Sequence, residues 1–200
     1  MNLYLIRHGA YVFNEKLVPY DRGLTETGIK QTEQLRDRLL KTGEIKADIV
    51  VSSTLPRAIQ TAQILAPAFG VDFEQDADFE EWRNCNEDNL PVNLGPELAK
   101  VPPEQLTFYL ACPGCETYAD FMYRACTALN RLVTKNPDKN IVIVCHGGIV
   151  EAAFHLFFGF SPFEPTPVTM FLDPDYTSIT HWRRYGTKWM LCSYNDKSHL

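Results

Sequence analysis

The sequence predicts an α/β protein, a three-layer α/β/α sandwich with a mostly parallel central sheet and a lid-like insertion. Three observations support this fold class. Apolar runs at residues 3–6, 47–53 and 140–144 have the length of buried strands. Helix-like segments alternate with them, which is typical of a parallel sheet with helices on both faces. A stretch at residues 72–114, rich in acids and prolines, interrupts the alternation.

The first half of the chain contains two predicted helices. Residues 26–42 carry apolar side chains at helical spacing and are followed by a glycine, a common helix stop. Residues 55–69 form the second predicted helix, with Pro56 in its first turn. Ser53 or Thr54 is expected to cap its N-terminus, since both are good N-cap residue types.

The connections in the first half are expected to be irregular. A polar loop is predicted from the end of the first strand to about Thr25. Residues 72–114 are interpreted as an insertion that lies over a site, with one short helix around residues 103–110. The length of 200 residues suits a single domain, residues 1–200, that includes this insertion.

The second half begins with a long helix over about residues 116–135, for which Thr117 is the expected N-cap. A near-continuous apolar strand, a glycine turn and a further helix follow it. The tail offers further candidate strands around residues 168–172, 177–185 and 188–195.

Composition narrows the class of partner and the compartment. The 19 Lys and Arg against 25 Asp and Glu give a net charge of −6, without blocks of like charge, which argues against nucleic acid or a membrane as the partner. No apolar stretch reaches the roughly 18 residues of a spanning helix. A cytoplasmic protein with six reduced cysteines is therefore expected, acting on a small anion. The sequence does not indicate the oligomeric state.

Basic and imidazole side chains follow three predicted strands at the point where each ends. Arg7 and His8 follow the first strand, Arg57 comes shortly after the second, and His146 follows the third. Because the carboxyl ends of parallel strands gather at one edge of an open sheet, these side chains are expected to converge. The planar guanidinium group matches phosphate oxygens. The sequence therefore favours a phosphate-containing ligand.

Each of these residues also has a structural interpretation. Arg7 is compatible with a solvated charge, His146 with the cap of a buried strand, and Arg57 with an ordinary first-turn residue. His8 is harder to explain this way, because Gly9 admits close backbone approach and the preceding cation disfavours protonation of the imidazole. We therefore expect His8 to be neutral and nucleophilic.

An ordered set of motifs covers nearly the whole chain. It consists of LIRHG at 5–9, Asn14, Asp21 with LTETG at 24–28, SSTLPRAIQTA at 52–62, GCETYADFMYR at 114–124 and VCHGG at 144–148. In these motifs the chain resembles the histidine phosphatase superfamily, the phosphoglycerate mutase-like proteins of branch 1.

The resemblance implies roles for several of the motif residues. His8 would attack phosphorus and become a phosphohistidine, so that phosphoryl transfer is split into two steps. Arg7, Arg57 and His146 would hold the phosphate oxygens and stabilise the transition state. Asn14 and Gly147 would also contact the bound phosphate. The scheme requires neither a metal ion nor another cofactor, because cationic side chains supply the positive charge.

The leaving alkoxide needs a proton, and the acidic run at residues 76–90 supplies candidates. Alignment of the phenylalanine in this run with the apolar residue that precedes the family's acidic position makes Glu81 the expected proton donor, with Glu80 as the alternative. A carboxyl group that faces a phosphate is suited to act first as an acid and then as a base. The other acids of the run are compatible with a solvated loop.

Departures from the family pattern favour a phosphatase over a mutase. Ala10 stands where mutases carry an acidic or amide residue, and Gly148 stands where phosphoglycerate mutases carry Asn. The usual tryptophan-glutamate-glycine signature is missing from residues 85–89. The alternatives are a mutase of the same fold and a binding protein that holds a phosphorylated ligand without turnover. The phosphate ester itself is not identified by the sequence.

The CPGC stretch at residues 112–115 has the spacing of a redox pair or half of a zinc site. A zinc site would need a second pair at similar spacing, and the remaining cysteines are scattered. The sequence alone therefore assigns no role to Cys112 and Cys115.

Overall fold

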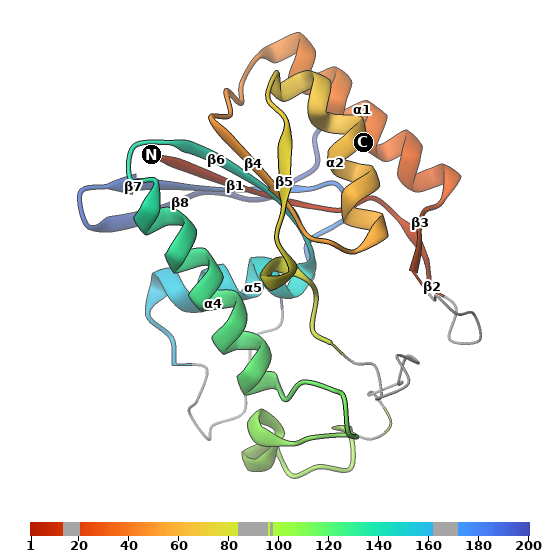
Figure 1. Ribbon diagram of the computed structural model, residues 1–200, viewed down its shortest axis with the longest axis vertical. Helices are drawn as coiled ribbons and strands as arrows, with labels where there is room; N and C mark the ends of the chain where they lie inside the picture. The colour runs from red at the N-terminus through yellow and green to blue at the C-terminus, as the bar shows by residue number, and fades with distance from the viewer. Residues whose placement is uncertain (14–20, 84–95, 97, 162–171) are drawn as a thin grey trace.

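A six-stranded sheet runs through the middle of the computed structural model (Figure 1). The structure describes residues 1–13, 21–83, 96, 98–161 and 172–200. The strand order across the sheet is β5 (Phe73–Gln75), β4 (Ile49–Ser52), β6 (Asn140–Cys145), β1 (Asn2–Arg7), β7 (Ile179–Tyr185) and β8 (Lys188–Asp196).

The first four strands of this order are parallel to one another. β7 is antiparallel to β1, and β8 is antiparallel to β7. The register places Arg7 beside Cys145 and Ser52 beside Val144. The strands β1, β4 and β6 therefore end level with one another, so the residues that follow them meet at one edge, as the sequence predicted.

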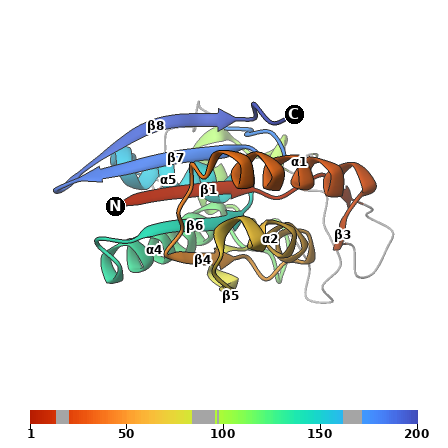
Figure 2. The ribbon, with the colours of Figure 1, turned by 90° about the horizontal axis from the view of Figure 1, so that it is seen from above.

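Helices cover both faces of the sheet (Figure 2). Side chains of α1 (Glu26–Thr42) and α2 (Pro56–Phe69) pack with Ile6, whereas those of α4 (Tyr118–Lys135) and α5 (Gly147–Phe158) pack with Leu5. Because neighbouring residues of a strand point to opposite faces, β1 contributes to both apolar layers. This arrangement confirms the predicted α/β/α sandwich and its mostly parallel sheet.

The helix boundaries follow the expected capping chemistry, with one exception. Thr25 caps α1, and Thr117 forms a capping box with Asp120 at the start of α4. The prediction for α2 was wrong, because its N-cap is Leu55 and no side chain caps it. Ser53 lies two residues before this N-cap, and its Oγ accepts a hydrogen bond from the Leu55 backbone N–H at 3.2 Å.

Two segments that the sequence analysis treated as irregular are strands. The expected polar loop contains a hairpin of β2 (Tyr11–Phe13) and β3 (Asp21–Leu24), and β5 extends the sheet where the insertion was expected to begin. All three strands are too short to show an alternating apolar pattern, and two of the three β5 residues are exposed.

Two 3₁₀ helices lie in the described part of the insertion, η1 (Ala77–Phe79) and η2 (Pro103–Phe108). The helix expected at 103–110 is thus present, but shorter. Residues 84–95 of the expected insertion, and all but the last residue of the strand expected at 168–172, lie outside the described residues. Within the described ranges, no helix is both long and apolar enough to cross a membrane.

Candidate active site

His8 lies directly after β1 and is 3% exposed. Its Nδ1 is 2.8 Å from the carbonyl oxygen of Gly9, and its Nε2 is 3.1 Å from Nε of Arg57. A carbonyl oxygen only accepts and a guanidinium N–H only donates, so these partners assign the proton to Nδ1 and a lone pair to Nε2. Burial, with Arg57 and then Arg7 adding to it, holds the pKa of His8 well below its usual value. The two hydrogen-bond partners and the lowered pKa both favour the neutral state that the sequence predicts for this imidazole.

Gly9 follows His8 at a point where there is no space for a side chain. A Cβ on residue 9 would lie 2.6 Å from the carbonyl oxygen of Gly28 and 2.8 Å from Oγ1 of Thr32. The Gly9 backbone N–H donates to Oγ1 of Thr61 at 3.1 Å. The segment after β1 is therefore held against both α1 and α2, which fixes the backbone that carries His8.

Arg57 enters the site from the first turn of α2 and is 3% exposed. Its Nη1 donates to Oδ2 of Asp21 at 2.5 Å, and its guanidinium carbon lies 4.4 Å from the centre of the Tyr11 ring. Asp21 is also buried, and its Oδ1 accepts the Gly23 N–H at 2.9 Å. A cation near a helix N-terminus is unfavourable, so this buried carboxylate offsets the position of Arg57.

His146 is the N-cap of α5 and is fully buried beside His8. The two ring centres are 5.0 Å apart, and Nε2 of His146 lies 2.8 Å from Oγ of Ser53. Burial, followed by Arg57, holds the pKa of His146 well below its usual value. Its Nδ1 is buried without a hydrogen-bond partner in the described part of the chain.

Arg7 is the last residue of β1 and reaches the rim of the same edge. Its Nη1 donates to the Asp173 carboxylate at 2.9 Å and to the backbone carbonyl of Pro174. Its guanidinium carbon lies 4.5 Å from the centre of the Tyr176 ring. The side chain is 19% exposed, and its ion-pair partner Asp173 is 71% exposed, so this pair is open to solvent.

The carboxyl group of Glu81 lies against the first turn of α5. Its Oε2 accepts the Gly148 N–H at 3.1 Å, and its Oε1 accepts the Trp82 N–H at 3.0 Å. A Cβ on Gly147 would be 4.0 Å from both Oε2 of Glu81 and Cζ of Arg7. Glu81 thus shares the sheet edge that carries the two histidines and the two arginines.

Glu80 is bound elsewhere, although it is the neighbouring residue. Its carboxylate accepts hydrogen bonds from the Thr54 hydroxyl and, at 2.9 Å, from Nε of Arg83. The ion pair between Glu80 and Arg83 is partly exposed to solvent. The two acids that the sequence could not separate are therefore turned towards different surroundings.

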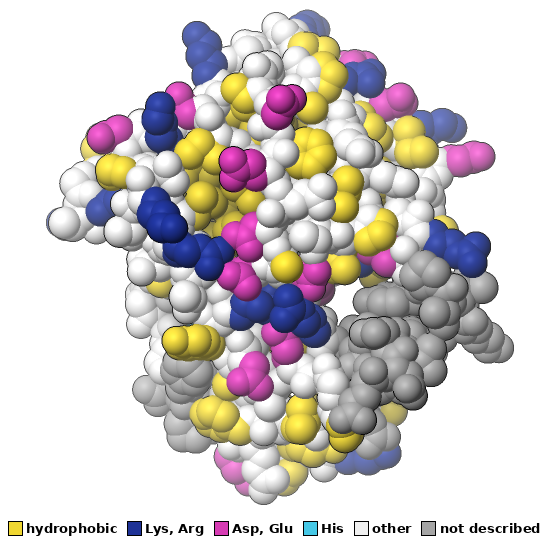
Figure 3. Space-filling view, in the orientation of Figure 1, with side chains coloured by type: hydrophobic (Ala, Val, Ile, Leu, Met, Phe, Trp, Pro, Cys, Tyr) yellow, Lys and Arg dark blue, Asp and Glu magenta, His cyan; other side chains and the backbone are white. Residues whose placement is uncertain are grey.

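Arg124 of α4 clamps the segment that carries Glu81. Its Nε and Nη2 each donate to the Glu116 carboxylate at 2.7 Å. Its Nη1 donates to the backbone carbonyls of Asp78 and Glu80, both at 2.9 Å, and Nη2 to that of Glu81 at 3.2 Å. We call the Glu116–Arg124 ion pair with these bonds the acid clamp. Figure 3 shows that acidic and basic side chains are interspersed on the face of the molecule that is turned to the viewer in Figure 1.

A comparison with known protein families decides the classification. The family described as the histidine phosphatase superfamily, branch 1, matches residues 3–197. The chain belongs to this superfamily. An Arabidopsis thaliana relative, phosphoglycerate mutase-like protein 4, is 30% identical over 208 residues, covering 98% of this chain and 85% of the relative. A metal-independent phosphoserine phosphatase from the same plant is 27% identical over 206 residues, covering 98% and 82%.

A solved structure confirms the superfamily fold. A mycobacterial glucosyl-3-phosphoglycerate phosphatase in complex with inorganic phosphate superposes with a TM-score of 0.74 at 21% identity. The superposition covers 100% of this chain and 99% of that chain. The relatives and this structure are named phosphatases or mutase-like proteins, consistent with the expected class, the phosphoric monoester hydrolases.

The structure brings most of the sequence-predicted site residues of this superfamily member together. Arg7, His8, Arg57, His146 and the Glu81 carboxyl group meet at the carboxyl edge of the sheet. Of the two other predicted phosphate contacts, Gly147 opens α5 directly after His146, and Asn14 lies outside the described residues. In the described ranges, no group of three or more His, Cys, Asp or Glu side chains is arranged to hold a metal ion.

Sequence reasoning assigned no site role to Asp21, Ser53 or Arg124. A signal existed for Asp21, because a buried arginine requires a buried anion. The sequence does not show which acid supplies it, since the pairing joins residues 36 positions apart. Arg124 has a weaker signal, its place in the motif at 114–124.

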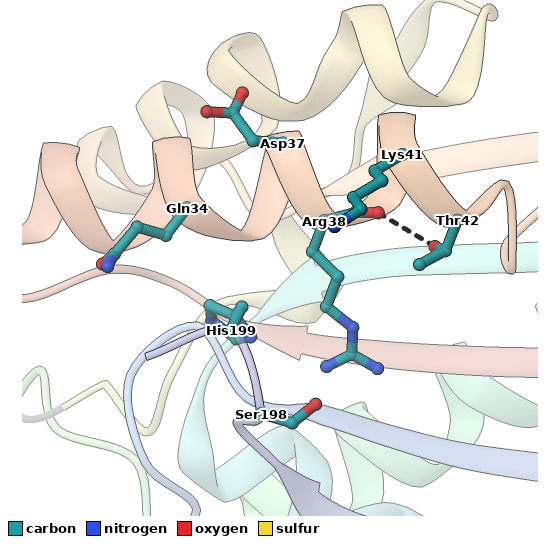
Figure 4. Close-up of a pocket in the computed structure, with 7 residues that line it drawn as sticks. All are labelled: Gln34, Asp37, Arg38, Lys41, Thr42, Ser198 and His199. Atoms are coloured by element: carbon teal, nitrogen blue, oxygen red, sulfur yellow. Dashed lines mark hydrogen bonds between the residues drawn. The ribbon is translucent and has the colours of Figure 1, made fainter.

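A shallow depression elsewhere on the surface contains none of the site residues (Figure 4). It lies between α1 and the C-terminal residues Ser198 and His199. Its arginine, Arg38, already pairs with Glu44 and Asp196, each at 2.7 Å. The positive charge of Arg38 is therefore balanced within the protein.

Proposed function

We propose that this protein hydrolyses small phosphate monoesters through a phosphohistidine on His8, without a metal ion. The membership of the superfamily and the named phosphatases among its relatives support phosphatase activity. One observation carries the proposed mechanism, the neutral His8 imidazole whose Nε2 lies 3.1 Å from Nε of Arg57. A neutral imidazole nitrogen that needs no deprotonation, set beside a cation, suits attack on a phosphate ester.

In the first step, Nε2 of His8 attacks phosphorus and the bond to the ester oxygen breaks. Arg57 donates to Nε2 in the structure and turns this donor to a phosphate oxygen when substrate binds. Arg7 and His146 contact further oxygens, and Gly147 and Asn14 remain proposed contacts. Fixed donors at these positions stabilise the charge of a loose transition state, so positioning and electrostatics supply most of the catalysis.

Glu81 is the proposed proton donor to the leaving alkoxide. Its carboxyl group lies at the N-terminal turn of α5, next to the sheet edge, whereas Glu80 is occupied by Thr54 and Arg83. In the second step, the same carboxylate removes a proton from the water that attacks phosphohistidine. Inorganic phosphate leaves and His8 returns to its neutral state.

The substrate class is proposed as small phosphate monoesters. One relative is named for phosphoserine, and one structure of the same fold for glucosyl-3-phosphoglycerate. Both names describe compact phosphorylated molecules. The insertion that follows β5 is proposed as a lid over the ester group, and the chain from 1 to 200 as one domain.

The test is release of inorganic phosphate from an aryl phosphate in the presence of EDTA. Wild type is expected to be active, and His8→Ala is expected to lose turnover and also the acid-labile phosphoryl group that denaturation traps on the wild-type chain. His181→Gln is the matched control, since His181 stacks on Tyr4 and lies outside the site. Activity abolished by the chelator, or an unaffected His8→Ala variant, would overturn the proposal. Transfer of phosphate to a second substrate without its release would instead identify a mutase.

A further inference from the structure

Cys112 and Cys115 face each other across a tight turn between η2 and α4. Their Sγ atoms are 3.1 Å apart, inside the van der Waals contact distance of two sulfur atoms. The backbone N–H of Cys115 donates to the carbonyl of Cys112 at 3.2 Å, which closes the turn. Gly114 has a φ of 89°, a conformation that a residue with a side chain rarely adopts. The backbone therefore holds the two sulfurs together.

We propose that Cys112 and Cys115 are a reversible redox modification site, whose disulfide slows the phosphatase through the acid clamp. The reagent is a small-molecule disulfide such as oxidised glutathione. The effect on turnover rests on the proposed function, whereas formation of the bond does not. The CPGC spacing alone did not support such a role, and the distance between the two sulfurs supplies the missing observation.

The reaction consists of two thiol–disulfide exchanges. One cysteine thiolate attacks a sulfur of the small-molecule disulfide, which forms a mixed disulfide and releases one small thiolate. The second cysteine attacks the protein sulfur of the mixed disulfide, forms the Cys112–Cys115 bond and releases the other small thiolate. The two protons of the cysteine thiols end on the two released thiols. The protein is oxidised by two electrons, and the small-molecule disulfide is reduced by two.

Both sulfurs are placed to react within one chain. Each cysteine is partly buried, so the turn is neither closed to a small reagent nor fully solvated. A disulfide bond is about 2.0 Å long, so the sulfurs must approach by roughly 1 Å. Once the first cysteine carries the reagent, the second is already at attacking distance. Closure of the ring therefore competes well with addition of a second reagent molecule.

The turn is joined to the acid clamp by the next residue in the chain. Glu116 follows Cys115, and its backbone N–H donates to the carbonyl of Arg83 at 2.8 Å. Its own backbone carbonyl accepts Nε1–H of Trp82 at 2.9 Å, and its carboxylate holds Arg124. Formation of the disulfide tightens the turn and shifts Glu116. The shift reaches the backbone of the Glu81 segment through the hydrogen bonds of Glu116 to Trp82 and Arg124.

The expected kinetic effect follows from this route. The phosphate-binding groups Arg7, Arg57 and His146 come from β1, α2 and the N-cap of α5. Within the described part of the chain, no hydrogen bond joins them to the acid clamp. A displaced acid lowers kcat, because catalysis is sensitive to misplacement of about 1 Å. Substrate binding depends on the phosphate contacts, so KM is expected to change little.

The other described cysteines provide internal references. Burial raises the pKa of Cys126 to about 11 and also raises that of Cys145, which is fully buried. Both thiols are therefore poorly reactive near neutral pH. Cys192 is exposed and distant in sequence from the turn, so oxidised glutathione is expected to add to it as a mixed disulfide.

The first experiment is peptide mapping of the full chain after treatment with oxidised glutathione. The peptide that holds residues 112–115 is expected to lose two hydrogens in mass, to carry no glutathione and to recover with dithiothreitol. Cys112→Ser is expected to carry glutathione on Cys115 instead. If wild type keeps both thiols while Cys192 is modified, or carries glutathione without ring closure, the proposal is wrong.

The second experiment compares kcat for one phosphate ester in the oxidised and reduced protein. Oxidation is expected to lower kcat several-fold with KM nearly unchanged, and reductant is expected to restore it. Cys192→Ser should retain the effect, and the Cys112→Ser/Cys115→Ser double variant should lack it. A disulfide that forms without altering kcat overturns the coupling to the acid clamp. A protein that is inactive when reduced refutes the proposed function instead, and peptide mapping still decides whether the disulfide forms.

Discussion

Glu81 occupies the space that a side chain on residue 148 would need. Oε2 of Glu81 accepts the backbone N–H of Gly148 at 3.1 Å, and a Cβ on residue 148 would lie 2.2 Å from Oε1. The same Cβ would lie 2.7 Å from Cζ of Phe121. The glycine that departs from the mutase pattern is therefore the residue that admits the carboxyl group to the first turn of α5.

Gly148→Ala should displace the Glu81 carboxyl group and lower kcat by about 10- to 100-fold, since misplacement of about 1 Å has effects of this size. Gly147→Ala is the matched comparison, because the nearest atom to its Cβ would be 3.8 Å away, an ordinary contact. We expect a clearly smaller loss from Gly147→Ala. Steady-state kinetics and melting temperatures of both variants check this, and equal losses would contradict the assigned role of Gly148.

Glu81→Gln should lower kcat by about 100- to 10,000-fold with an alkyl phosphate, because an alkoxide leaves poorly without a proton donor. With an aryl phosphate the loss should be much smaller, because a phenolate is a better leaving group. Glu80→Gln serves as the control, since Glu80 bonds to Thr54 and Arg83. The decisive measurement is the ratio of alkyl to aryl turnover. A ratio that falls for Glu80→Gln and stays constant for Glu81→Gln would exchange the two assignments.

The sequence predicts the sheet edge well because strand ends are local features. His8 and His146 directly follow apolar runs, and the rule that parallel strands end together places them side by side. The sequence also predicts the charge of the ligand, because two arginines and two histidines at one edge suit an anion.

The hydrogen-bond and ion-pair partners of these residues cannot be predicted from the sequence in the same way. Asp21 lies in β3 and meets Arg57 of α2 only because the fold brings these two segments together. No periodic pattern marks the short strands β2 and β3. The separation of Glu80 from Glu81 depends on backbone direction after η1, which the acid clamp sets from α4. Such contacts depend on tertiary packing, which local propensities do not encode.

Asp21→Asn tests the buried ion pair with Arg57. The variant leaves the guanidinium buried without its counter-charge, which is expected to lower the free energy of unfolding by about 3 to 5 kcal/mol. Asp173→Asn removes the exposed partner of Arg7 and should change it by at most about 1 kcal/mol. Urea unfolding of the two variants at one pH measures the difference. Comparable losses would show that the Arg57 pair is effectively solvated.

Burial lowers the pKa of all five histidines, which makes stability depend on pH in a defined window. Burial holds the pKa values of His8 and His146 well below normal, and burial lowers the pKa of His199 to about 4. Unfolded histidines titrate near pH 6.5, so between about pH 6.5 and 4 the unfolded chain binds more protons than the folded one. The histidine contribution to stability is therefore complete above this window and declines as the pH falls through it.

Urea unfolding at pH 7 and pH 5 should show a lower free energy of unfolding at pH 5. His199→Gln should reduce that difference, whereas His181→Gln, which removes a histidine with a smaller downward pKa shift, should reduce it less. An equal free energy of unfolding at the two pH values would mean that these imidazoles are accessible to protons in the folded state, and the neutral state of His8 on which nucleophilic attack depends would then be lost on mild acidification.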